Sequence, residues 1–182
     1  AGQETLVNGI LSGRDTLGIM PTGAGKSICY QVPALMLSGI TIVISPLISL
    51  MQDQVKALNE AGIHAAFINS SLSESQISKA LYLAAGGRYK IIYVAPERLN
   101  SDTFINLLNN IDISMISIDE AHCVSQWGHD FRPSYREIAN VILNLKKRPI
   151  VSAFTATATQ IVKDDIINLL QLSNPFTLTT GF

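Results

Sequence analysis

Short runs of apolar residues recur along the chain, and turn-forming or polar residues flank each of them. The runs are nearly continuous in apolar side chains, which is typical of strands buried on both faces. Segments with helical spacing of their apolar residues separate most of the runs. This alternation predicts an α/β domain, built as a three-layer parallel sheet with helices on both faces. The predicted strands are Thr16–Met20, Ile40–Ser45, Ala65–Asn69, Lys90–Val94, Ser114–Ile118 and Ile150–Phe154.

Helix boundaries are predicted from local signals between these runs. Ser73 followed by Gln76 forms a capping-box pattern, and Asp102 is an expected cap of the next helix. Gly39 and Gly62 are expected to end their helices, because glycine adopts the left-handed conformation common after a last helical turn.

The composition narrows the class of protein. A length of 182 residues with 47% hydrophobic and 15% charged residues fits one compact domain, expected over residues 1–182. Polar residues interrupt every apolar run short of the roughly 18 residues that a membrane-spanning helix needs. We therefore expect a soluble domain without membrane contact.

Charge and cysteine content exclude further classes. Thirteen basic and 14 acidic residues give a net charge of −1, so any contact with nucleic acid must be local. The two cysteines, Cys29 and Cys123, lie far apart and outside any CxxC spacing. We expect buried thiols of a cytosolic protein, with neither a disulfide framework nor a zinc site.

Ligands of open parallel sheets bind beyond the carboxyl ends of the strands. The loops after the predicted strands are therefore where chemistry is expected, and five of these loops carry unusual sequences. They follow Met20, Ser45, Val94, Ile118 and Phe154.

The first of these loops has the pattern of a phosphate-binding loop. Gly23 and Gly25 allow successive backbone N–H groups of Thr22–Ser27, Ala24 included, to point at phosphate oxygens. Lys26 is expected to neutralise the β and γ phosphates of a nucleotide, and Ser27 to ligate Mg²⁺. The strict pattern has glycine at the position of Met20. A predicted strand precedes this loop, and a predicted helix that starts near Ile28 follows it. This context favours a nucleotide site over a solvated glycine turn.

The predicted strand Ser114–Ile118 runs directly into an acidic motif, Asp119-Glu120-Ala121-His122. Buried carboxylates are costly unless a cation offsets them, so Asp119 is expected to hold Mg²⁺. Glu120 is expected to orient and deprotonate the attacking water. His122 is either a catalytic partner or a residue that hydrogen-bonds nearby backbone.

Glu120 also separates the competing hypotheses. A carboxylate directly after the metal-binding aspartate favours transfer of the γ-phosphoryl group to water. A phosphate-loop kinase would need an arginine-rich lid and an acceptor pocket, for which we find no segment. A non-catalytic nucleotide sensor would have no need of Glu120.

Several ordered motifs together resemble the RecQ family of superfamily 2 DNA helicases over essentially the whole chain. RNA helicases share the first and fourth of these motifs, whereas the fifth favours DNA. In chain order the motifs are Pro21–Ser27, Ser45–Met51, Ala95–Leu99, Asp119–His122, Ser125–Pro133 and Thr155–Thr159.

The resemblance implies the first RecA-like motor domain, a P-loop NTPase, of an ATP-dependent helicase. Such a helicase would use ATP and Mg²⁺, translocate 3′ to 5′ on single-stranded DNA and unwind forked DNA in repair and recombination. The family's second RecA-like lobe, with its arginine fingers, and its C-terminal modules would lie outside residues 1–182. The fragment alone is therefore expected to be nearly inactive, and the location cytoplasmic in a bacterium or nuclear in a eukaryote.

The resemblance also assigns roles to single residues. Gln3 is similar to the glutamine that recognises adenine, although the aromatic residue and arginine that normally precede it are absent. Ser45, Pro46 and Arg98 would contact DNA phosphates, which position a strand without reading its bases. The alternative, purely structural interpretations are a strand that ends at a proline and a salt bridge formed by Arg98.

The aromatic-rich segment would couple DNA binding to ATP hydrolysis. Trp127 and Phe131 can stack on bases, while Arg132 adds charge or cation–π attraction. Thr155 and Thr157 match the motif that links the ATP and DNA sites, or cap a helix. The basic triplet Lys146–Arg148 is interpreted as a solvated helix end.

Overall fold

The computed structural model describes residues 2–181 and contains one seven-stranded sheet, all of whose pairings are parallel. The strand order is β3-β4-β2-β5-β6-β1-β7. The strands are β1 (Thr16–Ile19), β2 (Ile40–Ile44), β3 (Ala65–Ile68), β4 (Ile91–Val94), β5 (Ile113–Ile118), β6 (Ile150–Thr155) and β7 (Phe176–Thr179).

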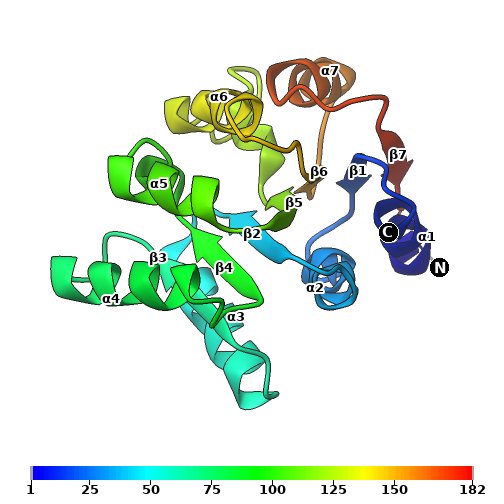
Figure 1. Cartoon of the computed structure of the whole chain (residues 1–182). Coiled ribbons are helices and arrows are strands. Elements are labelled where there is room, and N and C mark those ends of the chain that lie inside the picture. Colours follow the sequence, from blue (N-terminus) through cyan, green and yellow to red (C-terminus); the bar gives the residue numbers. More distant parts are fainter. Residues whose placement is uncertain (1, 182) are drawn as a thin grey trace.

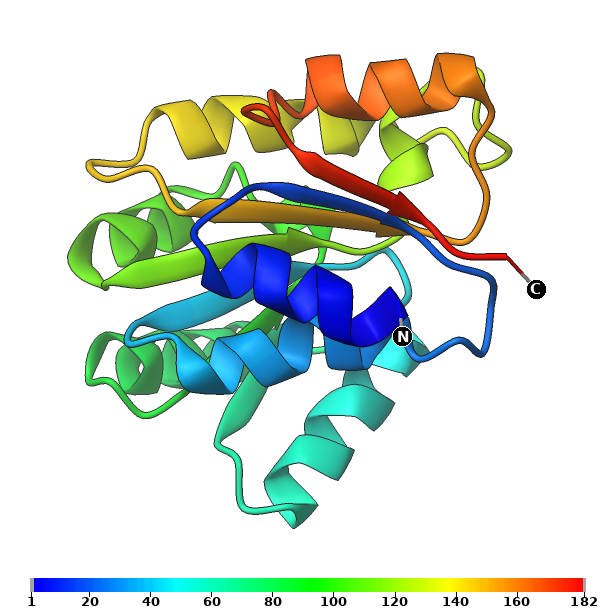
Figure 2. The same ribbon diagram turned by 90° about the vertical axis from the view of Figure 1, so that its right-hand side faces the viewer.

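Helices cover both faces of this sheet, so the predicted three-layer architecture is confirmed (Figures 1 and 2). One face packs against α1 (Gly2–Leu11), α2 (Lys26–Met36) and α3 (Ile48–Glu60). The other packs against α4 (Glu74–Ala85), α5 (Asp102–Asn110), α6 (Ile138–Leu143) and α7 (Gln160–Leu169).

All six predicted strands are present, and a seventh was missed. In β7 half-buried and exposed side chains alternate, so the segment lacks the continuous apolar run of the central strands. It lies at the sheet edge and pairs with β1 in the register Thr16↔Phe176 (Figure 2).

The predicted helix boundaries are partly confirmed. The Ser73–Gln76 capping box is present, and Gly62 adopts φ 84° directly after the α3 cap residue. The expected Asp102 cap is wrong, because the Ser101 side chain accepts the Phe104 N–H and Asp102 is the first helical residue. Gly39 does not end α2 either, since the cap residue of that helix is Leu37.

Gly39 has a packing role instead. A Cβ atom there would lie 2.6 Å from both the Asp112 carbonyl oxygen and the Ser114 hydroxyl oxygen, so glycine allows the close approach of the chain before β5. The Ser114 hydroxyl accepts the Gly39 N–H.

The basic triplet differs from its interpretation as a helix end. It follows α6 by more than a residue, and Lys146 and Lys147 are exposed. Arg148 forms a two-pronged ion pair with the buried Asp15, at 2.6 and 3.1 Å. Its role is therefore to hold the sheet together at the amino ends of the strands.

Two further findings concern excluded classes. Both cysteines are free and buried, as expected. Within residues 2–181, no helix combines the length and apolarity required to cross a bilayer.

Candidate nucleotide site and its aromatic loop

The glycine-rich segment between β1 and α2 forms a turn with the conformations that its glycines permit. Gly23 and Gly25 have φ of 83° and 74°, in the left-handed region. Gly25 immediately precedes the helix, which begins at Lys26 rather than near Ile28. The loop thus delivers Lys26 and Ser27 to the first turn of α2, where free N–H groups and the helix dipole favour an anion.

Met20 departs from the strict glycine pattern without distorting the loop. Its side chain is buried at the end of β1, with the Cys29 sulfur 3.6 Å from its own sulfur. Its backbone is not among the residues with positive φ. The position therefore needs no glycine and adds to the core instead.

Gln3 reaches this loop from α1. Its side-chain amide donates to the carbonyl oxygens of Ala24, at 2.9 Å, and Gly25, at 3.3 Å. The sequence prediction that Gln3 belongs to the nucleotide site is thus consistent with its position. The Lys26 ammonium group donates to the Met20 carbonyl oxygen at 3.2 Å, so it must exchange this partner to reach a phosphate.

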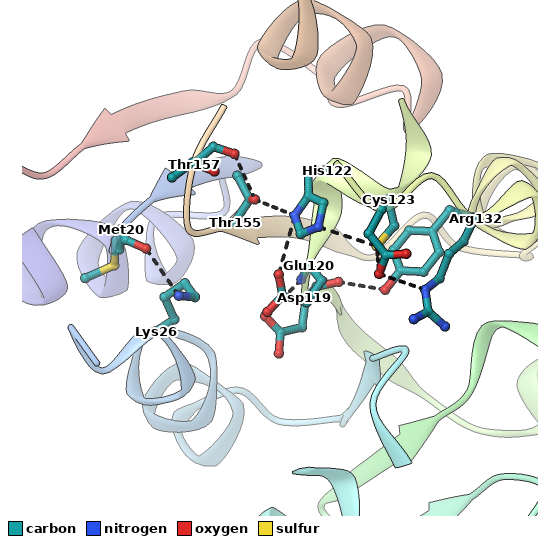
Figure 3. Close-up of polar contacts among 11 residues, drawn as sticks. Met20, Lys26, Asp119, Glu120, His122, Cys123, Arg132, Thr155 and Thr157 are labelled. Carbon is teal, nitrogen blue, oxygen red and sulfur yellow. Dashed lines mark hydrogen bonds and ion pairs between the residues drawn. The ribbon is translucent and has the colours of Figure 1, made fainter. Parts of the chain in front are cut away.

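Asp119 and Glu120 follow β5 at the carboxyl ends of the strands, on the side of the site where Lys26 lies (Figure 3). The Asp119 N–H donates to the Ile44 carbonyl, and the Tyr135 hydroxyl donates to the Asp119 carbonyl at 2.8 Å. These bonds clamp the Asp119 backbone. Glu120 then takes a left-handed conformation, φ 50°, that turns the chain sharply. Strain of this kind in a residue other than glycine costs about 1–2 kcal/mol and is common at functional sites.

The Asp119 carboxylate has the environment of a cation ligand. It is 6% exposed. Among the described residues its one hydrogen-bond donor is the adjacent Glu120 N–H. Burial, reinforced by the nearby Glu120 charge, raises the pKa of Asp119 to about 6. A divalent cation would supply the missing positive charge, so the surroundings of Asp119 fit Mg²⁺.

His122 occupies the centre of a hydrogen-bonded chain (Figure 3). Burial lowers the pKa of His122 to about 4, so the ring is neutral near pH 7. Its Nδ1 lies 2.8 Å from the Thr155 hydroxyl and 3.4 Å from Glu120 Oε2. Since the Thr155 hydroxyl donates to the Thr157 carbonyl, its oxygen accepts from His122 Nδ1–H. The Glu120 contact is therefore not an ion pair.

The aromatic segment crosses directly over His122. A Cβ on Gly128 would lie 2.6 Å from the His122 carbonyl oxygen, so this crossing needs glycine. The His129 ring stacks on the His122 ring with centroids 4.1 Å apart. Trp127 is 74% exposed. A cleft of about 380 Å³ lies between this loop and the start of α7, lined by His122, Trp127, Gly128, His129, Thr157, Ala158, Thr159 and Val162.

The charged residues around the loop have partners within the loop itself. Arg132 pairs with Asp130 at 3.1 Å. The cation over the Phe131 ring is Arg136, at 5.2 Å from its centroid. Sequence reasoning missed His129 and Arg136, although both lie within or beside the recognised motif.

The DNA-contact candidates also divide by exposure. The Ser45 side chain is 1% exposed, and its hydroxyl has no hydrogen-bond partner in residues 2–181. Ser49, four residues later, is exposed and better placed for a phosphate. Pro46 and Arg98 are half-buried, and no salt bridge to Arg98 exists in the described part of the chain. The interpretation of Arg98 as an ion-pair partner is therefore not supported.

His122, Cys123 and Asp130 bring three potential metal-ligand atoms within 4.8 Å of one another. Two features oppose a metal centre there. Burial raises the pKa of Cys123 to about 12, which disfavours the thiolate that binds metals. Arg132 already occupies the Asp130 carboxylate. The cluster is better explained as support for the loop.

Comparison with known proteins identifies the class. The family model described as DEAD/DEAH box helicase matches residues 1–165, and the chain belongs to this family. Its fold is that of RecA-like helicase domains. The Pyrococcus furiosus Hef helicase domain superimposes with a TM-score of 0.73, at 22% identity, over 99% of this chain and 37% of that chain. The DUF1998 helicase MrfA bound to DNA gives a TM-score of 0.73, at 20% identity, over 98% of this chain and 25% of that chain.

Within the family, the resemblance to RecQ helicases is confirmed. The chain is 54% identical to the ATP-dependent DNA helicase RecQ of Bacillus subtilis, over 100% of this chain and 31% of the relative. It is 46% identical to the RecQ of Haemophilus influenzae, over 95% of this chain and 28% of the relative. The chain thus spans about a third of the length of these relatives.

Proposed function

We propose that this chain is the ATP-binding motor domain of a RecQ-type DNA helicase, which couples ATP hydrolysis to 3′-to-5′ movement on single-stranded DNA and to unwinding of forked DNA. The observation that carries the proposal is the chain of contacts from Glu120 through His122 to Thr155 and Thr157, with the aromatic loop stacked on its histidine. One set of contacts joins the hydrolytic carboxylate to the segment suited to bind DNA bases.

Each nucleotide-site residue has a task that fits its position. Gln3 holds the loop and faces the adenine side. The N–H groups of Thr22 to Gly25 and the Lys26 ammonium group bind phosphates. Ser27 and Asp119 hold Mg²⁺, which, when bound, neutralises charge on the phosphoryl oxygens. Glu120 accepts a proton from the attacking water and is oriented by neutral His122.

The DNA side consists of exposed and half-buried groups. Trp127 is 74% exposed and offers a face on which a base can stack. Arg98 is available for a phosphate, and Arg132 and Phe131 shape the loop behind Trp127. These contacts do not distinguish bases, so the proposed binding tolerates any sequence.

Turnover is proposed to require the second RecA-like lobe. An arginine finger contributes about 10³- to 10⁵-fold in rate in related phosphoryl transfers. The domain alone is expected to bind nucleotide weakly, to hydrolyse it slowly and not to unwind DNA.

The test is ATPase activity of the full-length protein with and without single-stranded DNA. We expect DNA to stimulate the wild type, Lys26→Ala to abolish turnover, and Trp127→Ala to lose mainly the stimulation. Lys79→Ala, at an exposed lysine of α4, and Trp127→Phe, which keeps an aromatic face, are the matched controls. If DNA leaves wild-type turnover unchanged, the helicase proposal fails.

A further inference from the structure

A partly buried polar network links the sheet to the helices α2 and α3. The Gln31 side-chain amide donates to Gln54 Oε1 at 2.6 Å and to the Tyr93 hydroxyl at 2.9 Å. An amide nitrogen carries two hydrogens, so both are used. Gln31 belongs to α2, Gln54 to α3 and Tyr93 to β4.

The surroundings make these bonds restrictive. Tyr93 is 1% exposed, in a cluster that includes Val43, Met51 and Val55. Burial raises the pKa of Tyr93, so its hydroxyl stays protonated. Gln31 and Gln54 are half-buried, whereas Tyr93 lies in this apolar cluster, where an unpaired polar group is costly and alternative partners are few. The network therefore favours one relative position of α2, α3 and β4.

Each of these elements leads to a functional segment. Gln31 lies about 7.5 Å along α2 from Lys26, at 1.5 Å per residue. The helix that carries Gln54 starts at Ile48, inside the segment that begins with Ser45. The strand that carries Tyr93 ends at Val94, directly before Ala95 and the turn that contains Arg98. One side chain thus connects the phosphate-loop helix to both segments proposed to bind DNA phosphates.

We infer that Gln31, with Gln54 and Tyr93, is a positioning residue that transmits nucleotide binding to the DNA-phosphate segments, by a route separate from His122 and the aromatic loop. To reach a phosphate, the Lys26 ammonium group must leave the Met20 carbonyl. A phosphate bound by the free N–H groups at the start of α2 also pulls on the first turn of that helix. The network makes the segments after β2 and β4 follow this adjustment. The inference rests on the proposed function, because it assumes that those segments bind DNA.

The experiment measures coupling by binding alone, in the full-length protein. The coupling factor is the ratio of the Kd for an oligothymidine without and with a non-hydrolysable ATP analogue plus Mg²⁺, which by linkage equals the reciprocal effect on the analogue. In Gln31→Met, Gln54→Met and Tyr93→Phe this factor is expected to fall about 2- to 30-fold. The Kd of each ligand in the absence of the other should stay within about twofold.

Two controls separate the network from general damage. Gln52→Met removes a hydrogen bond from the same helix, to Ser71 at 3.0 Å, but none to α2, and should retain coupling. Gln54→Glu keeps an acceptor for the Gln31 amide and should retain it as well. Tyr93→Phe removes one oxygen atom without changing the packing shape, so it decides the matter if a glutamine variant folds poorly.

The outcomes separate the two proposals. A wild type without coupling overturns the proposed function itself. A coupled wild type with unchanged factors in Gln31→Met and Tyr93→Phe overturns the inference alone. So does an equal loss in Gln52→Met, because α3 would then transmit the effect without the network.

Discussion

Two aspartates lie buried at opposite ends of the same sheet, and they differ in how many hydrogen-bond donors surround the carboxylate. Asp15, at the amino end of β1, is 3% exposed and accepts from Arg148 Nη1 and Nη2 and from the backbone N–H groups of Val151 and Ser173. Asp119, at the carboxyl end of β5, is 6% exposed and accepts from the Glu120 N–H.

The number of donors around a buried carboxylate distinguishes a structural charge from a functional one. A carboxylate whose acceptor sites are filled by the protein stabilises the fold. One whose acceptor sites are left open raises the free energy of the folded state until a ligand occupies them. The two ends of the sheet are thus specialised, the amino ends for stability and the carboxyl ends for binding.

The largest expected effect is on catalysis at the carboxyl end. Asp119→Asn should lower the DNA-stimulated ATPase of the full-length protein by about 10³-fold, since metal binding contributes several kcal/mol of transition-state stabilisation. Its melting temperature should not fall, because an unpaired buried charge is removed. A variant with normal turnover, or one that melts well below the wild type, would break the comparison.

The same substitution at the amino end should have the reverse result. Asp15→Asn removes a charge that Arg148 needs, and we expect the free energy of unfolding to fall by about 3 kcal/mol. Nucleotide affinity of the remaining folded protein should be unchanged. Chemical denaturation measures the loss, with Glu60→Gln as control, since the Lys56–Glu60 pair is exposed and should contribute less than about 1 kcal/mol.

The two aspartate sites also differ in how far the sequence predicts them. The Asp119 site is local: a strand, a phosphate loop and an acidic motif each have a short signature, and their meeting follows from a parallel sheet. The Asp15 cluster has no such signature, because its partner Arg148 is 133 residues away. The sequence instead suggested that Arg148 ended a solvated helix.

Other failures have the same physical origin. β7 was missed because an edge strand needs no continuous apolar run. The burial of the Ser45 side chain likewise has no local signal, because it depends on the neighbouring strands β4 and β5. Gln31 lies in an amphipathic helix in which nothing marks its amide as paired with Gln54 and Tyr93. Motifs identify chemistry, whereas tertiary packing decides which neighbours are exposed or paired.

A smaller effect is expected on the pH dependence of stability. Burial lowers the pKa of His122 from 6.5 to about 4, so through this residue the folded protein loses stability as pH falls from 6.5 to 4. Burial raises the pKa of Asp119 from 3.8 to about 6, so through this residue the folded protein gains stability as pH falls from 6 to 3.8. The two contributions oppose each other.

Removing one contribution should reveal the other. Without Mg²⁺, the unfolding free energy of Asp119→Asn should fall by about 2 kcal/mol more than that of the wild type between pH 6.5 and 4. Denaturant titrations across this range measure the slope. Parallel curves for the two proteins would contradict the assigned surroundings of Asp119.

The smallest expected effect on stability comes from relieving backbone strain at the two ends of the sheet. Gln171, at the amino-end side, has φ 53° and its carbonyl accepts from Arg148, while Glu120 has φ 50°. Gln171→Gly and Glu120→Gly should each stabilise the fold by up to about 1 kcal/mol. Only Glu120→Gly should abolish ATPase activity. Loss of activity in Gln171→Gly would show that the two ends are not independent.

The most direct test of the comparison is the effect of Mg²⁺ on nucleotide affinity, measured by titrating a fluorescent ATP analogue with and without the cation. We predict that Mg²⁺ tightens binding to the wild type and to Asp15→Asn, and that it has little effect on Asp119→Asn. Full Mg²⁺ enhancement in Asp119→Asn would contradict the account, because the open acceptor sites of that carboxylate would then not be the place of the cation.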